Sequence, residues 1–168
     1  MQQQVYIGLT NPKSPTNVGS IMRASGCFLV SSVFYTGQRY AHAVKFQTDT
    51  KNVSAKIPLL KTDDLLGHVP KGCKIVCVDL VEGATPLPEY QHPEHAFYVF
   101  GPEDGTISQS VIDQADDVIY IPTIGCLNLA ATVNVVLYDR MAKTSHINAS
   151  DELIRQSRDN NNRVKVKK

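Results

Sequence analysis

The sequence predicts an α/β fold in which a mostly parallel sheet is flanked by helices on both sides. Short runs rich in β-branched and aromatic residues alternate with segments of helical periodicity. These runs are apolar at nearly every position, which is typical of strands buried on both faces rather than of a half-exposed antiparallel sheet. With 168 residues, of which 42% are hydrophobic and 20% charged, the chain has the size and composition of one globular domain.

The predicted strands are short and spread along the chain. They lie at VYIGL near Val5, SSVFY near Val33, KIVCV near Ile75, AFYVF near Phe97 and DVIYI near Val118. The stretch from Gly37 to Leu60 is polar and weakly periodic, and we expect loops and short helices there, near a partner surface. No repeat or linker divides residues 1–150, which we predict to form one domain followed by a basic, partly disordered tail at 151–168.

Two helices are predicted most clearly. The first runs from Asn17 to Cys27, with Thr16 or Asn17 as its N-cap, and one face carries Val18, Ile21, Met22 and Ser25. The second runs from about Asn128 to Lys143, where Leu129, Val133, Val136 and Leu137 recur at intervals of three and four. Its opposite face carries Asp139, Arg140 and Lys143.

Composition narrows the classes of protein. No apolar run approaches the roughly 18 residues of a spanning helix and no leader pattern is present, so we expect a cytoplasmic protein without a membrane partner. The four cysteines form no CxxC pair and the five histidines form no ligand pattern, so we expect reduced thiols and no metal. The last eighteen residues hold six basic and three acidic side chains, which is typical either of a solvated tail or of an arm that contacts phosphates.

The segment NPKSPTNVGSIMRASGCF places Asn17, Gly19 and Arg23 at the head of the first helix. Residues four apart lie one above the other and long side chains lean toward the N-terminus, so Arg23 should reach back over Gly19. A glycine inside a helix costs roughly 1 kcal/mol, which is easier to explain if another backbone or a substrate approaches closely. The spacing therefore indicates a concave, cationic site, although a capped surface helix with an exposed arginine is the simpler alternative.

Two later segments also place loops where ligands bind. In AFYVFGPEDGTIS an apolar strand ends at Gly101, and Glu103 lies in the turn before a short helix that starts near Ser108. In VIYIPTIGCLNLAATVNVVLYDR a strand runs through a loop with Gly125 and Cys126 into the helix at Asn128. Each segment alone is also explained as an ordinary turn or a core connection.

Together, in this order and at these distances, the three segments resemble the three motifs of the TrmH (SpoU) branch of the SPOUT class of RNA methyltransferases. The first motif is matched by Asn17, Gly19 and Arg23, the second by FGPEDG, and the third by IPTIGCLNLA leading into VVLYD. The resemblance covers nearly the whole chain. It implies a C-terminal trefoil knot that forms a pocket for S-adenosylmethionine, a homodimer, and 2′-O-methylation of ribose in tRNA or rRNA, with tRNA favoured.

The resemblance also implies roles for particular residues. Arg23 is expected to contact the RNA beside the methyl acceptor, with Asn17, Glu103 and Asn128 shaping that site. The cofactor is expected against Gly101, Ile121, Cys126 and Leu127, with a further backbone contact near Asp79. Arg23 is expected either to help deprotonate the 2′-hydroxyl or to stabilise a developing alkoxide, and the second role is the safer one since an arginine normally stays protonated.

The third motif departs from the family pattern at two positions. The family usually carries serine where this chain has Cys126 and Ala130, and a thiol is a weak hydrogen-bonding group. The alternative interpretation is therefore a knotted RNA-binding protein with impaired catalysis. An unrelated nucleotide-binding α/β enzyme is disfavoured, because the chain lacks a GxGxxG or Walker-type loop.

Overall fold

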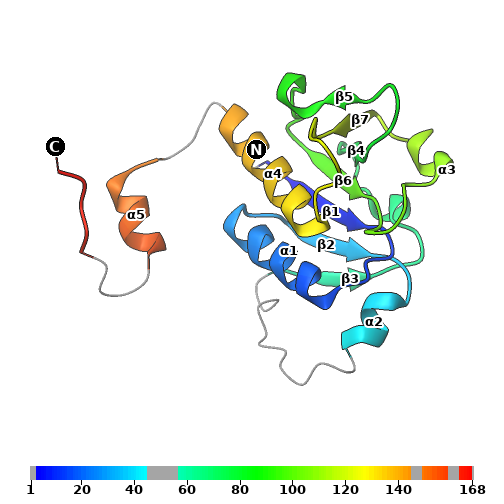
Figure 1. The fold of residues 1–168 in the computed structure, drawn as a ribbon, viewed down its shortest axis with the longest axis horizontal. Coiled ribbons are helices and arrows are strands. Elements are labelled where there is room, and N and C mark those ends of the chain that lie inside the picture. Colours follow the sequence, from blue (N-terminus) through cyan, green and yellow to red (C-terminus); the bar gives the residue numbers. More distant parts are fainter. Residues whose placement is uncertain (1–2, 45–56, 145–148, 159–162, 168) are drawn as a thin grey trace.

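A seven-stranded sheet forms the centre of the protein (Figure 1). The computed structural model describes residues 3–44, 57–144, 149–158 and 163–167. The strand order is β3-β2-β1-β6-β4-β7-β5, and all the strand pairs in this described part are parallel. The strands are β1 (Val5–Leu9), β2 (Ser32–Tyr35), β3 (Leu59–Lys61), β4 (Lys74–Val78), β5 (Thr85–Pro86), β6 (Ala96–Phe100) and β7 (Asp117–Tyr120). The parallel α/β prediction is confirmed.

The predicted strands correspond to β1, β2, β4, β6 and β7, whereas β3 and β5 were missed. Both missed strands are short and lie at the sheet edges, where few residues carry the strand pattern. The prediction of loops and short helices for Gly37 to Leu60 is wrong at its end, because Leu59 and Leu60 pair with β2. Helix α2 (Arg39–Val44) fits that prediction, and residues 45–56 lie outside the described part of the chain.

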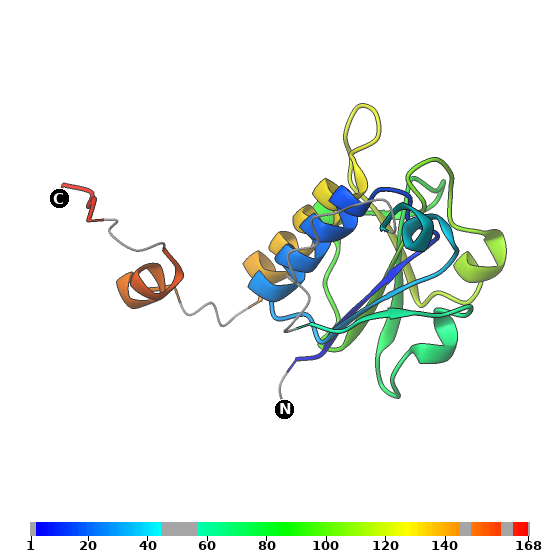
Figure 2. The same ribbon diagram turned by 90° about the horizontal axis from the view of Figure 1, so that it is seen from below.

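Helices α1 (Pro15–Cys27) and α4 (Leu129–Lys143) pack side by side on one face of the sheet, as Figures 1 and 2 show. The other face is covered by α3 (Gln109–Ile112) and by the segment around the 3₁₀ helix η2 (Leu66–His68). In the central strand β6, Tyr98 packs toward α1 and α4, while Phe97 and Val99 pack toward the other layer. Period-two alternation of a strand buried on both faces therefore builds two cores.

Helix α1 begins two residues earlier than its predicted start at Asn17. Ser14 is the N-cap, with its Oγ accepting a hydrogen bond from the Asn17 N–H over 3.3 Å, so the predicted cap at Thr16 or Asn17 is wrong. Pro15 explains the difference, because its fixed φ and missing N–H suit the first turn of a helix. Asn17 therefore lies inside the first turn, where its side chain is free of the capping role.

Helix α4 begins where the sequence predicts. The Asn128 side chain caps it by accepting a hydrogen bond from the Ala131 N–H over 2.8 Å. The predicted inward residues Leu129, Val133, Val136 and Leu137 are all buried. The prediction is wrong for Arg140, which is only 6% exposed because its guanidinium donates to the carbonyls of Pro93 and Glu94 and to the Tyr98 hydroxyl.

Two further elements complete the described chain. The 3₁₀ helix η3 (Leu87–Glu89) packs near α4, and helix α5 (Asp151–Ser157) lies apart from the sheet in Figures 1 and 2. Helix α5 falls within the predicted tail at 151–168, a boundary that stays a prediction. In the described residues, no helix has the length and apolar character needed to cross a membrane.

Candidate active site

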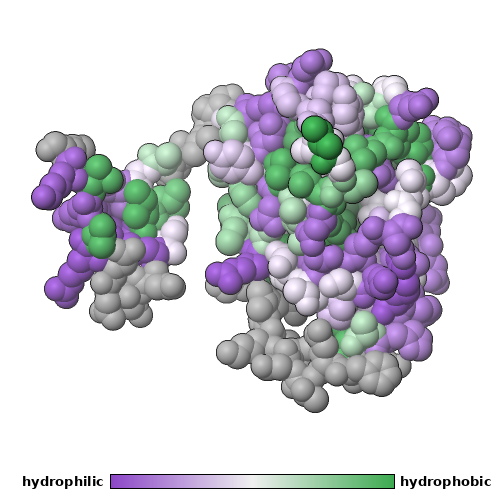
Figure 3. Space-filling model, viewed as in Figure 1, coloured by the Kyte–Doolittle hydropathy of each residue, from purple (hydrophilic) through white to green (hydrophobic). Residues whose placement is uncertain are grey.

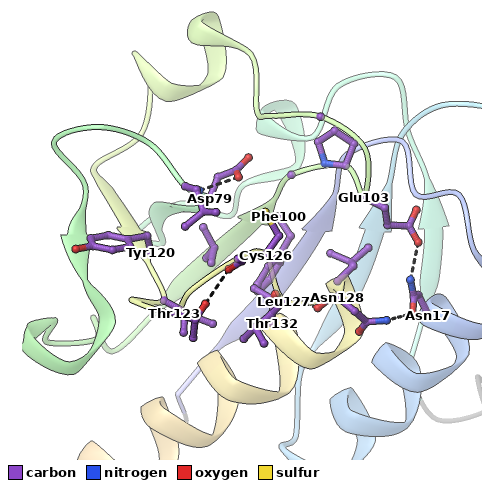
Figure 4. Close-up of a pocket in the computed structure, with 18 of the residues that line it drawn as sticks. Asn17, Asp79, Phe100, Glu103, Tyr120, Thr123, Cys126, Leu127, Asn128 and Thr132 are labelled. Carbon is purple, nitrogen blue, oxygen red and sulfur yellow. Dashed lines mark hydrogen bonds between the residues drawn. The ribbon is translucent and has the colours of Figure 1, made fainter.

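A cavity of about 610 Å³ opens at the carboxyl ends of β4, β6 and β7. Its floor includes the last residue of each of these strands, namely Val78, Phe100 and Tyr120. The walls come from the loops after β6 and β7, the N-terminus of α1 and the first turn of α4 (Figure 4). Open parallel sheets bind ligands at this edge, and the volume lies within the range of small-molecule sites.

The loops after β4 and β6 meet closely at one wall of the cavity. Asp79 follows β4, and its carboxylate accepts hydrogen bonds from the N–H groups of Leu80 and Ile107 over 2.8 and 2.9 Å. A Cβ atom on Gly101 would lie 2.2 Å from the Asp79 carboxylate. A side chain at position 101 would displace this carboxylate, so glycine suits the close approach of the two loops, and the predicted cofactor residues Asp79 and Gly101 are brought together.

The loop after β7 forms the opposite wall and projects from the body of the protein (Figure 2). Residues 122–128 are all exposed, including the predicted cofactor residues Cys126 and Leu127, and Ile121 lines the cavity beside them. The Thr123 hydroxyl donates to the Gly125 carbonyl over 3.1 Å, and Gly125 has a φ of +80° that favours glycine. In the described structure the N–H groups of Cys126 and Leu127 have no acceptor, so this loop offers free backbone donors to a ligand.

Three of the predicted catalytic residues form one chain of hydrogen bonds at the rim (Figure 4). The Asn17 Nδ2 donates to the Glu103 carboxylate over 2.6 Å. The Asn128 Nδ2 donates to the Asn17 Oδ1 over 2.8 Å, and the Asn128 Oδ1 is held by the N-cap bond of α4. Because each amide has a partner for both its oxygen and its nitrogen, the orientation of both side chains is determined.

Glu103 also lies at the N-terminus of α1. Its carboxylate accepts hydrogen bonds from the N–H groups of Lys13 and Ser14 in addition to that from Asn17. A carboxylate is stabilised there by the unpaired N–H groups and by the positive end of the helix dipole. Glu103 therefore joins the loop after β6 to α1 and holds Asn17 toward Asn128.

Arg23 and Gly19 are not part of this arrangement. Arg23 is exposed on α1 and does not line the cavity, and a Cβ atom on Gly19 would meet open space. The expectation that Asn17, Gly19 and Arg23 form one concave site within the protomer is therefore wrong. Their positions on the helix explain this, because Gly19 and Arg23 lie on the side of α1 opposite its buried face, whereas Asn17 borders that face.

The structure adds residues that the sequence analysis did not single out. Lys13, Tyr120 and Thr132 line the cavity, and the Thr132 hydroxyl donates to the Asn128 carbonyl over 3.0 Å. Ala130 is 7% exposed and packs in the core, away from the cavity lining. The spacing of Thr132 from Asn128, one helical turn, is the signal that could have found it.

The described residues contain no group of three or more His, Cys, Asp or Glu side chains arranged to hold a metal ion. The site instead has an apolar floor, a rim of oriented amides, the carboxylates of Asp79 and Glu103, and free backbone donors. Such a site suits a ligand with a flat apolar part and several hydrogen-bonding groups. The class of protein thus defined is a parallel α/β protein with a ligand-sized cavity at the carboxyl edge of its sheet.

The particular family follows from comparison with known proteins. The sequence profile of the SpoU rRNA Methylase family matches residues 4–138. The chain belongs to this family, as the three motifs predicted.

Relatives agree with this assignment. An uncharacterized tRNA/rRNA methyltransferase of Mycobacterium bovis is 29% identical over 142 residues, which cover 79% of this chain and 44% of that protein. The chain thus spans less than half the length of the curated relatives it matches. The TrmH/SpoU tRNA modifying enzyme of A. aeolicus is similar in structure, with a TM-score of 0.71 and 22% identity over 92% of this chain and 85% of that one. The AdoMet-bound rRNA methyltransferase of Sinorhizobium meliloti gives a TM-score of 0.69 and 20% identity over 84% and 57% of the two chains.

Proposed function

We propose that this protein is an S-adenosylmethionine-dependent RNA methyltransferase that modifies a ribose 2′-hydroxyl, with tRNA as the favoured substrate. The observation that carries the proposal is the chain of hydrogen bonds from Glu103 through Asn17 to Asn128 at the rim of the cavity. It comprises three of the four residues expected to shape the acceptor site. They come from three separate segments, so their meeting does not follow from any one motif.

The residues of the cavity fit the cofactor. An adenine ring needs an apolar surface, which Val78, Phe100, Tyr120 and Ile121 provide, and its polar edge needs backbone partners of the kind left free in the loop after β7. Gly101 has no side chain, so its backbone is open to the cavity, which Cys126 and Leu127 also line. When bound, S-adenosylmethionine supplies an electrophilic methyl group on its sulfonium.

The residues at the rim would orient the acceptor. A ribose hydroxyl is a poor nucleophile near neutral pH, so its alignment with the methyl group matters more than the strength of any base. Asn17 and Asn128 offer amides whose orientation is already determined by their neighbours, so they are preorganised for a ribose. Glu103 keeps this pair in place and adds negative charge near the acceptor.

The cavity still carries hydroxyl groups, although this chain lacks the serines that the family usually has at positions 126 and 130. Position 130 packs in the core, so a serine there would not line the cavity of this protomer. Thr123 and Thr132 carry hydroxyls and line the same cavity as Cys126. These two groups support a working site over the alternative of an RNA-binding protein with impaired catalysis.

We propose a homodimer in which Arg23 of one copy completes the site of the other. Gly19 and Gly26 lie seven residues apart on one exposed side of α1, with Arg23 between them, and a Cβ atom on either glycine would meet open space. Beside this surface α4 exposes Val135, Tyr138 and Met141 at 38, 60 and 36%. Figure 3 shows apolar residues gathered on the face that carries α4 and the loop after β7. The side of α1 that carries the two glycines lets another backbone approach closely, and the exposed apolar residues of α4 lie next to it. Together these surfaces suit close packing of a second copy.

The dimer is tested by Gly19→Leu, with Gln109→Leu on α3 as the matched control. Leucine at position 19 improves helix propensity and has space in the protomer, so the monomer should stay folded while close packing of α1 is blocked. Sedimentation should show a dimer for the control and a monomer for Gly19→Leu. A dimer in both would place the interface elsewhere.

The choice of tRNA, the knot and the cellular location are proposed from the resemblance to the family. The A. aeolicus tRNA modifying enzyme is matched over most of its length, whereas the S. meliloti rRNA methyltransferase is matched over 57%, and this supports tRNA. The C-terminal trefoil knot and a cytoplasmic location also belong to the proposal. An experimental backbone trace through β6, β7 and α4 tests the knot.

The deciding experiment is methyl transfer from labelled S-adenosylmethionine to bulk tRNA and, separately, rRNA from cells that lack this protein. Nucleoside analysis of the product should show a 2′-O-methylated nucleoside in tRNA. Glu103→Gln should abolish most of the transfer, while Glu89→Gln, an exposed glutamate on η3 outside the cavity, should leave it unchanged. Cofactor binding without any transfer would favour the RNA-binding alternative, and a methylated base would disprove the ribose acceptor.

A further inference from the structure

Arg39, the first residue of α2, joins two loops at the rim of the cavity. Its Nη1 donates to the Asp104 carboxylate over 2.6 Å. Its Nη2 and Nε both donate to the carbonyl oxygen of Asn11, over 2.6 and 3.2 Å. Asn11 belongs to the loop between β1 and α1, and Asp104 to the loop after β6. One planar guanidinium therefore spans the two loops that bring Glu103 to the N-terminus of α1.

Asn11 has an unusual conformation at this junction. Its φ is +42°, in the left-handed region, and its N–H donates to the Thr36 hydroxyl over 3.0 Å. Its Oδ1 is buried and has no hydrogen-bond partner among the described residues. Gly37 has a φ of +80°, and a Cβ atom there would lie 2.0 Å from the Asn11 Oδ1. Asparagine adopts this left-handed conformation more readily than most residues, and Arg39 supplies two hydrogen bonds that hold the Asn11 carbonyl in it.

We propose that Arg39 is a positioning residue for the candidate active site. By holding Asp104 and the Asn11 carbonyl together, it keeps the adjacent Glu103 against the N–H groups of Lys13 and Ser14 and against Asn17. The part of this inference that concerns methyl transfer rests on the proposed function. The part that concerns Glu103 does not.

The location of Arg39 separates this role from a role in global stability. The side chains of Arg39 and Asp104 are 31 and 54% exposed, and exposed ion pairs contribute little to stability. Arg39 does not line the cavity, so it acts through the two loops and not on a ligand inside. Its loss should therefore loosen the rim and leave the core intact.

The first test is amide hydrogen exchange of Arg39→Ala, which needs no activity. Exchange at the Lys13 and Ser14 amides, which donate to Glu103, should rise by at least about tenfold, because the loop that carries Glu103 is released. Ser31, whose N–H donates to the carbonyl of Val5 at the opposite end of β1, is the internal control and should not change. The melting temperature should fall by less than about 3 °C.

The second test is kinetic and compares Arg39→Ala with Lys61→Ala. Lys61 is an exposed cation close by, where its Nζ donates to Gln38 over 2.8 Å, so it controls for the loss of surface charge. Arg39→Ala should lower kcat by at least about tenfold with little change in cofactor Kd, since misplacing a reacting group by about 1 Å can cost 10²-fold. Lys61→Ala should match wild type. Arg39→Lys should recover only part of the loss, because one ammonium group cannot replace the fork that spans both loops.

Each outcome has a distinct meaning. In the Arg39→Ala, Asp104→Asn double variant, the kcat loss should be no larger than in Arg39→Ala alone, because both residues act through one contact. Unchanged exchange at Lys13 and Ser14 would overturn the inference. A higher KM for RNA, a weaker salt dependence and an unchanged kcat would overturn it as well, by assigning Arg39 to a phosphate contact. If the wild type transfers no methyl group, the proposed function fails, and the exchange result still decides the positioning role.

Discussion

The two ends of helix α4 use their hydrogen bonds in opposite ways. At the N-terminal end, Asn128 is exposed and shares its amide between the helix cap and Asn17. At the C-terminal end, Arg140 is 6% exposed and its guanidinium donates to the carbonyls of Pro93 and Glu94 and to the Tyr98 hydroxyl. The first end faces the cavity, and the second is closed by the chain itself.

The network at the C-terminal end extends beyond Arg140. The two ring nitrogens of His92 contact the Tyr98 hydroxyl and the Asp139 carboxylate over 2.6 and 2.8 Å. Lys143 pairs with Asp139 over 2.8 Å and donates to the carbonyls of Leu87 and Tyr90. The segment from residues 87 to 94 is thereby fastened to α4, and burial in this network raises the pKa of Tyr98 to about 12.

The difference shows that the two ends of one helix can serve different purposes, one the stability of the fold and the other the orientation of a ligand. The polar groups of the C-terminal end have their partners within the protein and have nothing left for a ligand. Those of the N-terminal end are held in place but remain accessible at the cavity.

The largest effect should follow from Arg140→Met, which keeps the volume but removes the donors. Leaving the Tyr98 hydroxyl and two carbonyls without this partner should cost about 3 kcal/mol of unfolding free energy and lower the melting temperature by roughly 10 °C. Methyl transfer per folded molecule should stay within about twofold. Denaturant unfolding and active-site titration measure the two quantities.

Arg155→Met is the matched control for this variant. Arg155 lies on α5, where its guanidinium is exposed and pairs with Glu152 alone among the residues that the structure describes, so its loss should cost less than about 0.5 kcal/mol. A tenfold loss of transfer per folded molecule in Arg140→Met would contradict the division of roles between the two ends of α4.

The next effect concerns Asn128→Ser at the open end. Serine can still cap α4 but is too short to donate to Asn17, so the unfolding free energy should change by less than about 0.5 kcal/mol. Transfer should fall by about 10²-fold, because the Asn17 amide loses its fixed orientation. Asn128→Ala removes the cap as well and should cost about 1 kcal/mol more. Equal activity of Asn128→Ser and wild type would remove this residue from the site.

The open end of α4 could be predicted from the sequence, and the closed end could not. The start of α4 at Asn128 and its inward residues follow from local signals, a capping residue and helical periodicity. Arg140 was placed on the polar face because its charge fits there. Its acceptors at Pro93 and Glu94 lie 47 and 46 residues away, and only the tertiary fold brings them into reach.

The rim of the cavity depends on even longer separations. Asn17 lies 86 residues from Glu103 and 111 residues from Asn128, so no local pattern relates them. Resemblance to a family indicated that these residues belong together, and the parallel sheet provides the physical reason by bringing loops after separate strands to one edge. The α1 cap was an avoidable error, since Ser14 followed by Pro15 is a readable helix start.

The pH dependence of stability provides a third test, at the closed end. Desolvation lowers the pKa of His92 below its ordinary value of 6.5 and outweighs the opposing effect of Asp139. The His92 imidazole therefore binds a proton less tightly in the folded protein than in the unfolded chain. The contribution of neutral His92 to the free energy of unfolding is present above about pH 6.5 and is lost as the pH falls toward the lowered pKa. The melting temperature of wild type should thus fall more steeply between pH 7 and 5 than that of His92→Gln.

Glutamine suits this comparison because its amide can donate to Asp139 and accept from Tyr98, as neutral histidine does, without taking up a proton. His95→Gln removes an imidazole outside the network, one that accepts a hydrogen bond from the Gln4 N–H, and should keep the wild-type slope. Parallel pH profiles for wild type and His92→Gln would show that the network tolerates the charged imidazole.

The smallest effect is expected in cysteine reactivity, which reports on both ends without any assay of transfer. Cys126 and Cys27 are exposed, whereas Cys77 is buried and its pKa is raised to about 12 by desolvation. Iodoacetamide should therefore modify Cys126 and Cys27 but not Cys77 in the folded protein. S-adenosylhomocysteine should slow modification of Cys126 by a few-fold and leave Cys27 unchanged, since only Cys126 lines the cavity and its loop stays open on one side. Peptide mass spectrometry over time measures the rates of modification. Equal protection of Cys126 and Cys27 would mean that the ligand reduces the accessibility of the whole protein. The open end of α4 would then not respond to the ligand independently.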